Sequence, residues 1–173
     1  MPRILAVDPG TAYVGLAVLD HEGTWLTKGC IKLNAVADPD AKIDTLKYDL
    51  HSFCLQHFCF ELKTHGSTPP NVAVVEQFKT YGLKGSGIQA FQMGRTIQAV
   101  LDTVMVTGLF KRVDTVNARD ARRFVCDNPS AKDPQVKEGL RLKGYDGKSN
   151  EHERDALALG LYWLDRWGKG RGE

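Results

Sequence analysis

Short apolar runs separated by polar turns dominate the first part of the chain. Residues 3–8, 13–20 and 25–33 are each predicted to form a strand, with turns at Gly10-Thr11 and at His21-Glu22-Gly23. Such short connections favour an antiparallel meander of three strands. A fourth apolar run, residues 72–75, is unbroken by polar positions, which is typical of a central strand buried on both faces.

Elsewhere the apolar residues recur at helical spacing. Asp38-Pro39-Asp40 predicts a helix start, and the apolar repeat that follows predicts a helix ending before Gly66. Further helices are expected over residues 88–107, 118–125, 135–142 and 151–167, with a short strand over 113–116. This order predicts one α/β domain over residues 1–173, a five-stranded mixed sheet flanked by helices, with residues 168–173 as a frayed tail.

Length and composition are those of an ordinary globular domain. Of the 173 residues, 42% are hydrophobic and 25% charged, enough to build a substantial core. No apolar run is long enough to span a bilayer, and the N-terminus lacks the features of a secretory signal, so a cytoplasmic location is expected. The four cysteines include no CxxC pair, which argues against a zinc site and favours reduced thiols.

The charge is unevenly distributed along the chain. The formal net charge is +2, but residues 111–148 carry ten Lys or Arg against six acids. That segment is therefore +4 and the remainder is −2. A segment of this kind attracts polyanions such as nucleic acid, or it consists simply of solvated helix faces. Composition does not separate these two interpretations.

Two predicted strands end on a carboxylate, at Asp8 and at Glu76, and the last helix begins with acidic residues. On that helix His152 and Asp155 are three residues apart and project from one face. Carboxylates gathered from distant segments can hold two Mg²⁺ or Mn²⁺ ions for phosphoryl-transfer chemistry. Alternatively, Asp8 is a turn former, whereas Glu151 and Glu153 are interpreted as complements of the helix dipole.

Three motifs together resemble the RuvC family of Holliday-junction resolvases, or crossover junction endodeoxyribonucleases. They are Asp8-Pro9-Gly10-Thr11 with Gly15, Val75-Glu76-Gln77-Phe78, and His152-Glu153-Arg154-Asp155-Ala156-Leu157-Ala158. The resemblance spans residues 3 to about 165 and implies an RNase H-like fold, with cutting of four-way DNA junctions by paired symmetric nicks. It implies two Mg²⁺ or Mn²⁺ ions held by Asp8, Glu76 and Asp155, which with His152 are the expected catalytic residues. His152 stands where many members have aspartate, and is a ligand or a proton shuttle.

The resemblance also implies DNA-binding residues outside the acidic cluster. An aromatic side chain that stacks at the opened junction is matched by Phe78, with Tyr81 second, in a basic glycine-rich loop; the alternative is that Phe78 lies in the core. Arg122 aligns with a functional lysine of the family, and as a poor proton donor it is expected to bind phosphate. Arg95 faces either DNA or solvent. The complete set of expected nucleic-acid contacts is Phe78, Lys79, Tyr81, Lys84, Arg119, Arg122, Arg123 and Lys132.

A homodimer is the last implication, because the long helix forms the subunit interface in the family. Paired active sites related by a two-fold axis suit a four-way junction. Two other functions remain open: a YqgF-type RNase H-like nuclease acting on RNA, whose first strand also ends in Asp-x-Gly-Thr, and a branched-DNA-binding protein without catalysis. The interface candidates are Ile88, Phe91, Gln92, Gly94, Ile97, Gln98 and Leu101.

Overall fold

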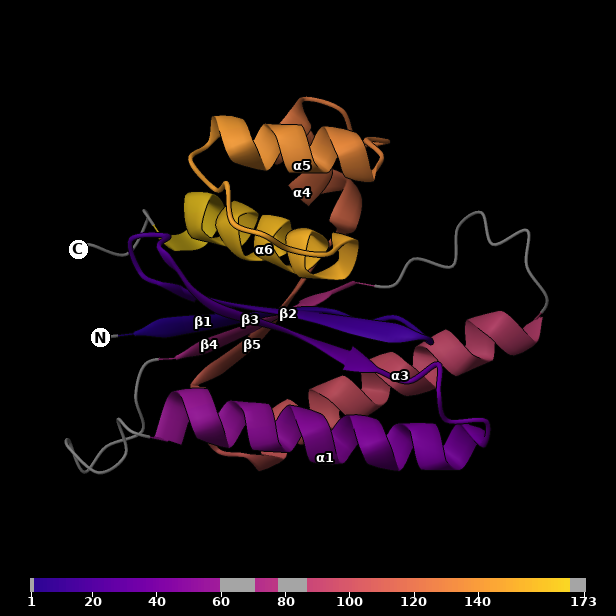
Figure 1. Ribbon diagram of the computed structural model, residues 1–173. Coiled ribbons are helices and arrows are strands. Elements are labelled where there is room, and N and C mark those ends of the chain that lie inside the picture. Colours follow the sequence, from indigo (N-terminus) through magenta and orange to yellow (C-terminus); the bar gives the residue numbers. More distant parts are fainter. Residues whose placement is uncertain (1, 60–70, 78–86, 169–173) are drawn as a thin grey trace.

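A five-stranded mixed sheet forms the centre of the molecule (Figure 1). The computed structural model describes residues 2–59, 71–77 and 87–168. Strands β1 (Arg3–Asp8), β2 (Tyr13–Asp20) and β3 (Trp25–Lys32) form the predicted antiparallel meander. Strand β4 (Val72–Glu76) pairs in parallel with the other edge of β1, and β5 (Arg112–Val116) pairs in parallel with β4. The strand order is therefore β3-β2-β1-β4-β5. The predicted fold class is therefore confirmed.

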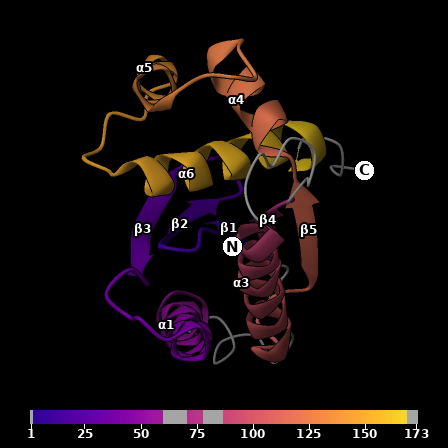
Figure 2. The same cartoon turned by 90° about the vertical axis from the view of Figure 1, so that its right-hand side faces the viewer.

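Helices cover both faces of this sheet (Figures 1 and 2). One face carries α1 (Pro39–Phe58) and α3 (Gly87–Val106), and the other carries α4 (Ala118–Cys126), α5 (Asp133–Leu142) and α6 (Glu151–Trp163). The alternation of β1 explains the two layers. Leu5 and Val7 lie in the core beneath α1 and α3, whereas Ile4 and Ala6 lie in the core beneath α6.

Helix α1 ends at Phe58, before Gly66 as the sequence predicts, and residues 60–70 lie outside the described part of the chain. The end of the last helix differs from the prediction. Helix α6 was expected to continue to Trp167, but its α-helical part ends at Trp163 and a π-helical turn, η2 (Leu164–Gly168), follows. In that wider turn the Trp167 ring stacks on Trp163, with ring centroids 6.4 Å apart. Hydrophobic spacing at 3.6 residues does not distinguish such a turn from a continued α-helix.

Close packing of α6 on the sheet depends on two glycines. A Cβ at Gly160 of α6 would lie 2.5 Å from a methyl carbon of Leu19, and a Cβ at Gly15 of β2 would lie 2.1 Å from the backbone oxygen of His152. Both distances are far shorter than real contacts. Glycine at these positions therefore lets the N-terminal turn of α6 reach the sheet edge where β1 and β4 end.

No helix among the described residues is long and apolar enough to cross a membrane. The four cysteines are free thiols, as the sequence predicted.

Candidate active site

Asp8 and Glu76 lie side by side because their strands are parallel neighbours. Val7 of β1 is in register with Val75 of β4, so the next residue on each strand reaches the same edge of the sheet. Asp8 is only 8% exposed. Burial, followed by a hydrogen bond with Asp8 and the negative charges of Asp8 and Asp155, raises the pKa of Glu76 to about 9. Without a metal ion in the site, a pKa this high favours the protonated form of Glu76 at neutral pH.

The N-terminal turn of α6 brings the third acid to this edge. Asn150 caps the helix, since its side chain accepts a hydrogen bond from the Glu153 amide and Glu153 accepts one from the Asn150 amide, both at 2.9 Å. Glu153 also lies 3.6 Å from Lys28. Glu153 is thus part of the capping box of the helix, and Asp155, two residues further on, faces the sheet edge.

His152 is held between two carboxylates and an aromatic ring. Its Nδ1 lies 3.2 Å from Asp8 Oδ2, and its Nε2 lies 3.5 Å from Glu151 Oε1. The hydrogen bond with Asp8 raises the pKa of His152, although burial opposes the shift. The Tyr13 ring stacks on the imidazole with centroids 5.3 Å apart, and Asn34 donates to the Tyr13 hydroxyl at 2.8 Å. Glu151 therefore faces this histidine, a role beyond complementing the helix dipole.

Tyr13 was missed in the sequence analysis. It is the first residue of β2, directly after the Asp8 turn, and its place in register across from Lys32 gave no hint of a contact with α6. Only the packing permitted by Gly15 brings the two rings together. The one available signal was an aromatic residue immediately beside a glycine-containing acidic motif.

Arg122 lies inside the acidic cluster. Its Nη2 is 2.9 Å from Asp155 Oδ2, across from helix α4 to helix α6. Burial raises the pKa of Asp155, while the hydrogen bond and positive charge of Arg122 lower it. The two acids on strands and the acid on the helix thus surround one guanidinium group.

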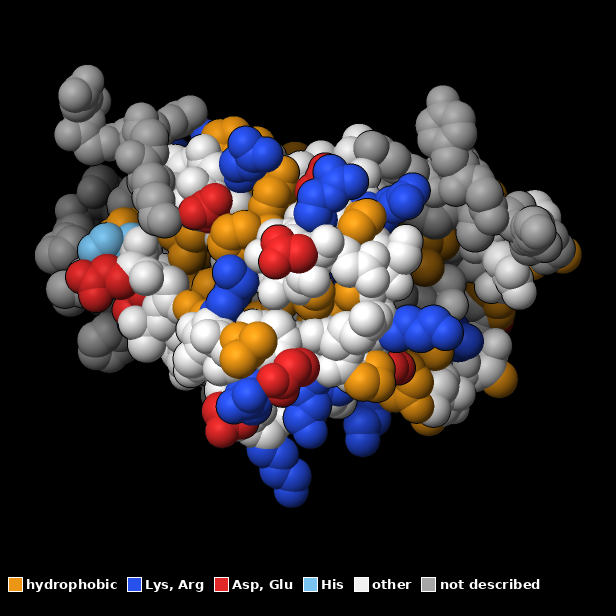
Figure 3. All heavy atoms as spheres, turned by 90° about the horizontal axis from the view of Figure 1, so that it is seen from above, with side chains coloured by type: hydrophobic (Ala, Val, Ile, Leu, Met, Phe, Trp, Pro, Cys, Tyr) orange, Lys and Arg blue, Asp and Glu red, His pale blue; other side chains and the backbone are white. Residues whose placement is uncertain are grey.

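The other predicted basic residues lie further out. Arg119 and Arg123 are exposed on α4, and Lys132 is exposed at the start of α5, where its amide donates to Gln135 Oε1 at 2.9 Å. Seen from the α4–α6 side, lysine and arginine side chains of the described residues are interspersed with acidic ones (Figure 3). Four predicted contacts, Phe78, Lys79, Tyr81 and Lys84, lie outside the described residues.

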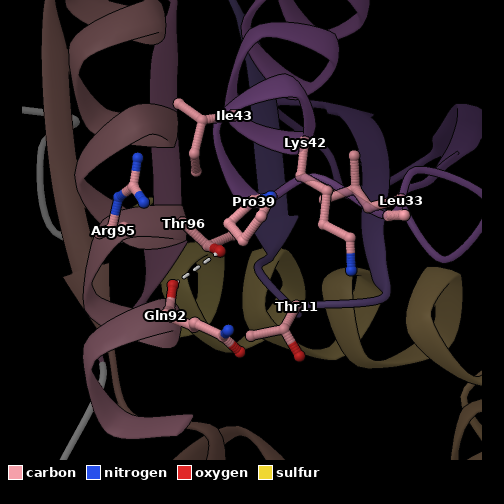
Figure 4. A pocket seen from close by; sticks show the side chains of 9 residues that line it. Thr11, Leu33, Pro39, Lys42, Ile43, Gln92, Arg95 and Thr96 are labelled. Atoms are coloured by element: carbon pink, nitrogen blue, oxygen red, sulfur yellow. Dashed lines mark hydrogen bonds between the residues drawn. The ribbon is translucent and has the colours of Figure 1, made fainter. Parts of the chain in front are cut away.

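A small pocket of mixed polar and apolar lining lies beside the turn that follows Asp8. Thr11 lines it together with Lys42 of α1 and with Gln92 and Arg95 of α3 (Figure 4). Arg95 is not simply solvated, because its Nη2 lies 2.5 Å from Asp40 Oδ1. Arg95 is thus paired with Asp40, whereas Lys42 forms no ion pair among the described residues.

The donor set suits a hard divalent cation. Asp8, Glu76 and Asp155 offer carboxylate oxygens, and His152 adds one nitrogen, a combination that matches Mg²⁺ or Mn²⁺. Within the described part of the chain, no three such side chains already stand in a ligand geometry. Existing partners account for this, because His152 is engaged with Asp8 and Arg122 with Asp155. The residue types fit such a metal.

The fold resembles solved resolvase structures. No protein-family model matches the chain, and no curated protein matches its sequence. Thermus thermophilus RuvC is similar over 94% of this chain and 95% of its own, with a TM-score of 0.68 and 18% identity. The T. thermophilus RuvC complex with a Holliday junction substrate is similar over 97% of this chain and 98% of its own, with a TM-score of 0.69 and 16% identity. The yeast mitochondrial Holliday junction resolvase Ydc2 is similar over 97% of this chain and 79% of its own, with a TM-score of 0.60 and 12% identity. At these identities the likeness shows a shared fold.

Proposed function

We propose that the chain is a metal-dependent endonuclease that cuts four-way DNA junctions. The observation that carries this proposal is the meeting of three acids, Asp8, Glu76 and Asp155, at one edge of the sheet. Burying carboxylates together is costly unless a cation compensates them. The raised pKa of Glu76 expresses that cost, and a purely structural turn would not need the arrangement.

The residues divide the work of hydrolysis. Asp8, Glu76 and Asp155, with His152, would hold two Mg²⁺ or Mn²⁺ ions. These ions would supply an activated water and stabilise the leaving oxygen. Tyr13 and Glu151 orient the imidazole of His152. Arg119 and Arg123, both exposed on α4, would contact phosphates of the DNA backbone. The expected products are a 5′-phosphate and a 3′-hydroxyl.

Two observations support junction DNA as the proposed substrate. The fold covers nearly the whole length of a RuvC that has been solved with a Holliday junction. In addition, α3 presents Ile88 and Phe91 to solvent at 68% and 67% exposure. Large apolar side chains of this kind commonly mark a protein interface, which supports a homodimer with two active sites.

A panel of substrates tests the proposal against its alternatives. The full chain is incubated with four-way, three-way and flap DNA and with structured RNA, in Mg²⁺, Mn²⁺ or EDTA. We expect paired symmetric nicks in the four-way junction with either metal and none in EDTA. Preferential cutting of RNA would favour a YqgF-type nuclease. Junction binding without cutting in both metals would favour a binding protein, although the acidic cluster would then repel phosphate.

A further inference from the structure

Arg122 makes contacts unlike those of an ordinary DNA-binding arginine. Its side chain is 35% exposed, and the exposed fraction of its partner Asp155 is 23%. The Arg122 Nε is shielded from solvent and meets no acceptor among the residues that the structure describes. The bond to Asp155 is thus the contact that fixes the guanidinium, and most of its donors remain unused.

The charge of Arg122 compensates the acidic cluster. Burial alone would lower the pKa of Arg122, yet the hydrogen bond with Asp155 and the charges of Asp155, Glu76 and Asp8 raise it. In turn, the positive charge of Arg122 lowers the pKa of both Glu76 and Asp155. Through its contact with Asp155 the guanidinium therefore compensates part of the negative charge of the cluster.

We propose that Arg122 competes with the metal for Asp155, so that the ion pair must open before Asp155 becomes a ligand. Arginine cannot lose its proton in a protein, so it leaves the carboxylate by moving rather than by titrating. Its Nε has no hydrogen bond to break among the described residues, so the movement breaks the ion pair with Asp155. Arg122 is in this sense a positioning residue that holds Asp155 in place while no metal is bound.

Metal affinity of the DNA-free protein tests the competition. Mn²⁺ binding is measured by calorimetry and by electron paramagnetic resonance for the full chain and its variants. Because Arg122→Gln removes the competing cation, we expect Mn²⁺ to bind about tenfold more tightly, equivalent to about 1.4 kcal/mol. Arg122→Lys keeps a cation near the acid, and a partly exposed pair of this kind should leave the affinity within about threefold of the wild type.

Arg123→Gln is the matched control. It removes one positive charge from the same helix, but Arg123 is exposed and makes no ion pair with Asp155. Its Mn²⁺ affinity should equal that of the wild type. An equal gain in Arg123→Gln would mean that general electrostatics, and not competition for Asp155, governs the affinity. Circular dichroism confirms that each variant is folded.

Two outcomes overturn the inference. Unchanged or weaker Mn²⁺ binding by folded Arg122→Gln would mean that Arg122 does not oppose the metal. Absence of Mn²⁺ binding by the wild type would remove the inference together with the proposed function on which it rests. The two failures are distinguishable, because a wild type that binds Mn²⁺ and cuts junctions keeps the proposed function even when Arg122→Gln changes nothing.

Discussion

At the scale of single residues, the site is a balance between buried acids and the few cations around them. Asp8, Glu76 and Asp155 share one edge of the sheet, where, among the described residues, Arg122 pairs with Asp155 and His152 lies beside Asp8. The metal-free protein responds by keeping a proton on Glu76. If Glu76 holds the proposed metal, proton binding and metal binding would be alternatives at this carboxyl group.

The raised pKa of Glu76 predicts how the free energy of unfolding of the metal-free protein depends on pH. The folded-state pKa of Glu76, about 9, exceeds its ordinary value of 4.5, so between these values the folded protein binds more protons than the unfolded chain. The free energy of unfolding in EDTA should fall as pH rises across that window. The raised pKa of His152 acts in the same direction, because its contribution is lost as pH rises through the folded value.

Thermal melts in EDTA between pH 5 and pH 9 measure this effect. In a chain of this size, each kcal/mol lost lowers the melting temperature by about 2–4 °C. Glu76→Gln cannot titrate, so its melting temperature should fall less with pH than that of the wild type. Parallel curves for the two proteins would show that Glu76 does not carry the raised pKa.

At the scale of elements, the position of α6 decides whether the site exists. The strand-end acids come from neighbouring parallel strands and need no further support, whereas His152 and Asp155 reach them only because Gly15 allows close approach of the helix. The capping box of Asn150 and Glu153 fixes the first turn of the same helix.

Gly15→Ala tests this dependence. The added Cβ would overlap the backbone oxygen of His152, so α6 must shift, at a cost of about 1–3 kcal/mol in the free energy of unfolding. Cleavage should fall with it, because His152 and Asp155 move away from Asp8. Gly94→Ala on α3 is the control for stability alone, because α3 is the predicted dimer interface; a Cβ there meets nothing within 4 Å, so the substitution should be neutral or stabilise by up to about 1 kcal/mol. Chemical denaturation is measured for both variants and junction cleavage for Gly15→Ala, and wild-type cleavage by Gly15→Ala would exclude the packing role.

The sequence predicted the fold well because its strands are short, apolar and bounded by clear turns. Strands that end on Asp8 and Glu76 also predicted where the two acids meet. The stack of Tyr13 on His152 and the pairing of Arg122 with Asp155 could not be predicted. Both depend on how helices from distant segments pack over the sheet edge, which no local pattern encodes.

At the scale of the whole molecule, the two helical layers have different surfaces. The α4–α6 layer carries interspersed charges, whereas α3 exposes Ile88 and Phe91. Such a division suits a protein whose α3 side meets a second copy while the edge of the sheet meets DNA. We therefore predict a homodimer whose interface includes the exposed face of α3 with Ile88 and Phe91.

Phe91→Ser should weaken that dimer. Sedimentation velocity should show a larger monomer fraction than for the wild type at equal concentration, because a large apolar contact is lost. Leu142→Ser is the control, since Leu142 is 72% exposed on α5, in the opposite layer. Equal monomer fractions for Phe91→Ser and wild type, or equal weakening by Leu142→Ser, would contradict an interface on α3.

The most direct test of the central claim is the cleavage rate of Glu76→Gln on a four-way junction, under single turnover and with the protein in saturating excess. The substitution removes one carboxylate charge and little volume. Mutating a residue that hydrogen-bonds to a metal ligand typically lowers metal affinity or activity by about 10–100-fold. Losing the ligand itself should therefore slow cleavage by more than about 100-fold. Junction affinity, measured in the same buffer, should stay close to that of the wild type. Cleavage by Glu76→Gln at the wild-type rate would mean that the acidic cluster is not the catalytic site.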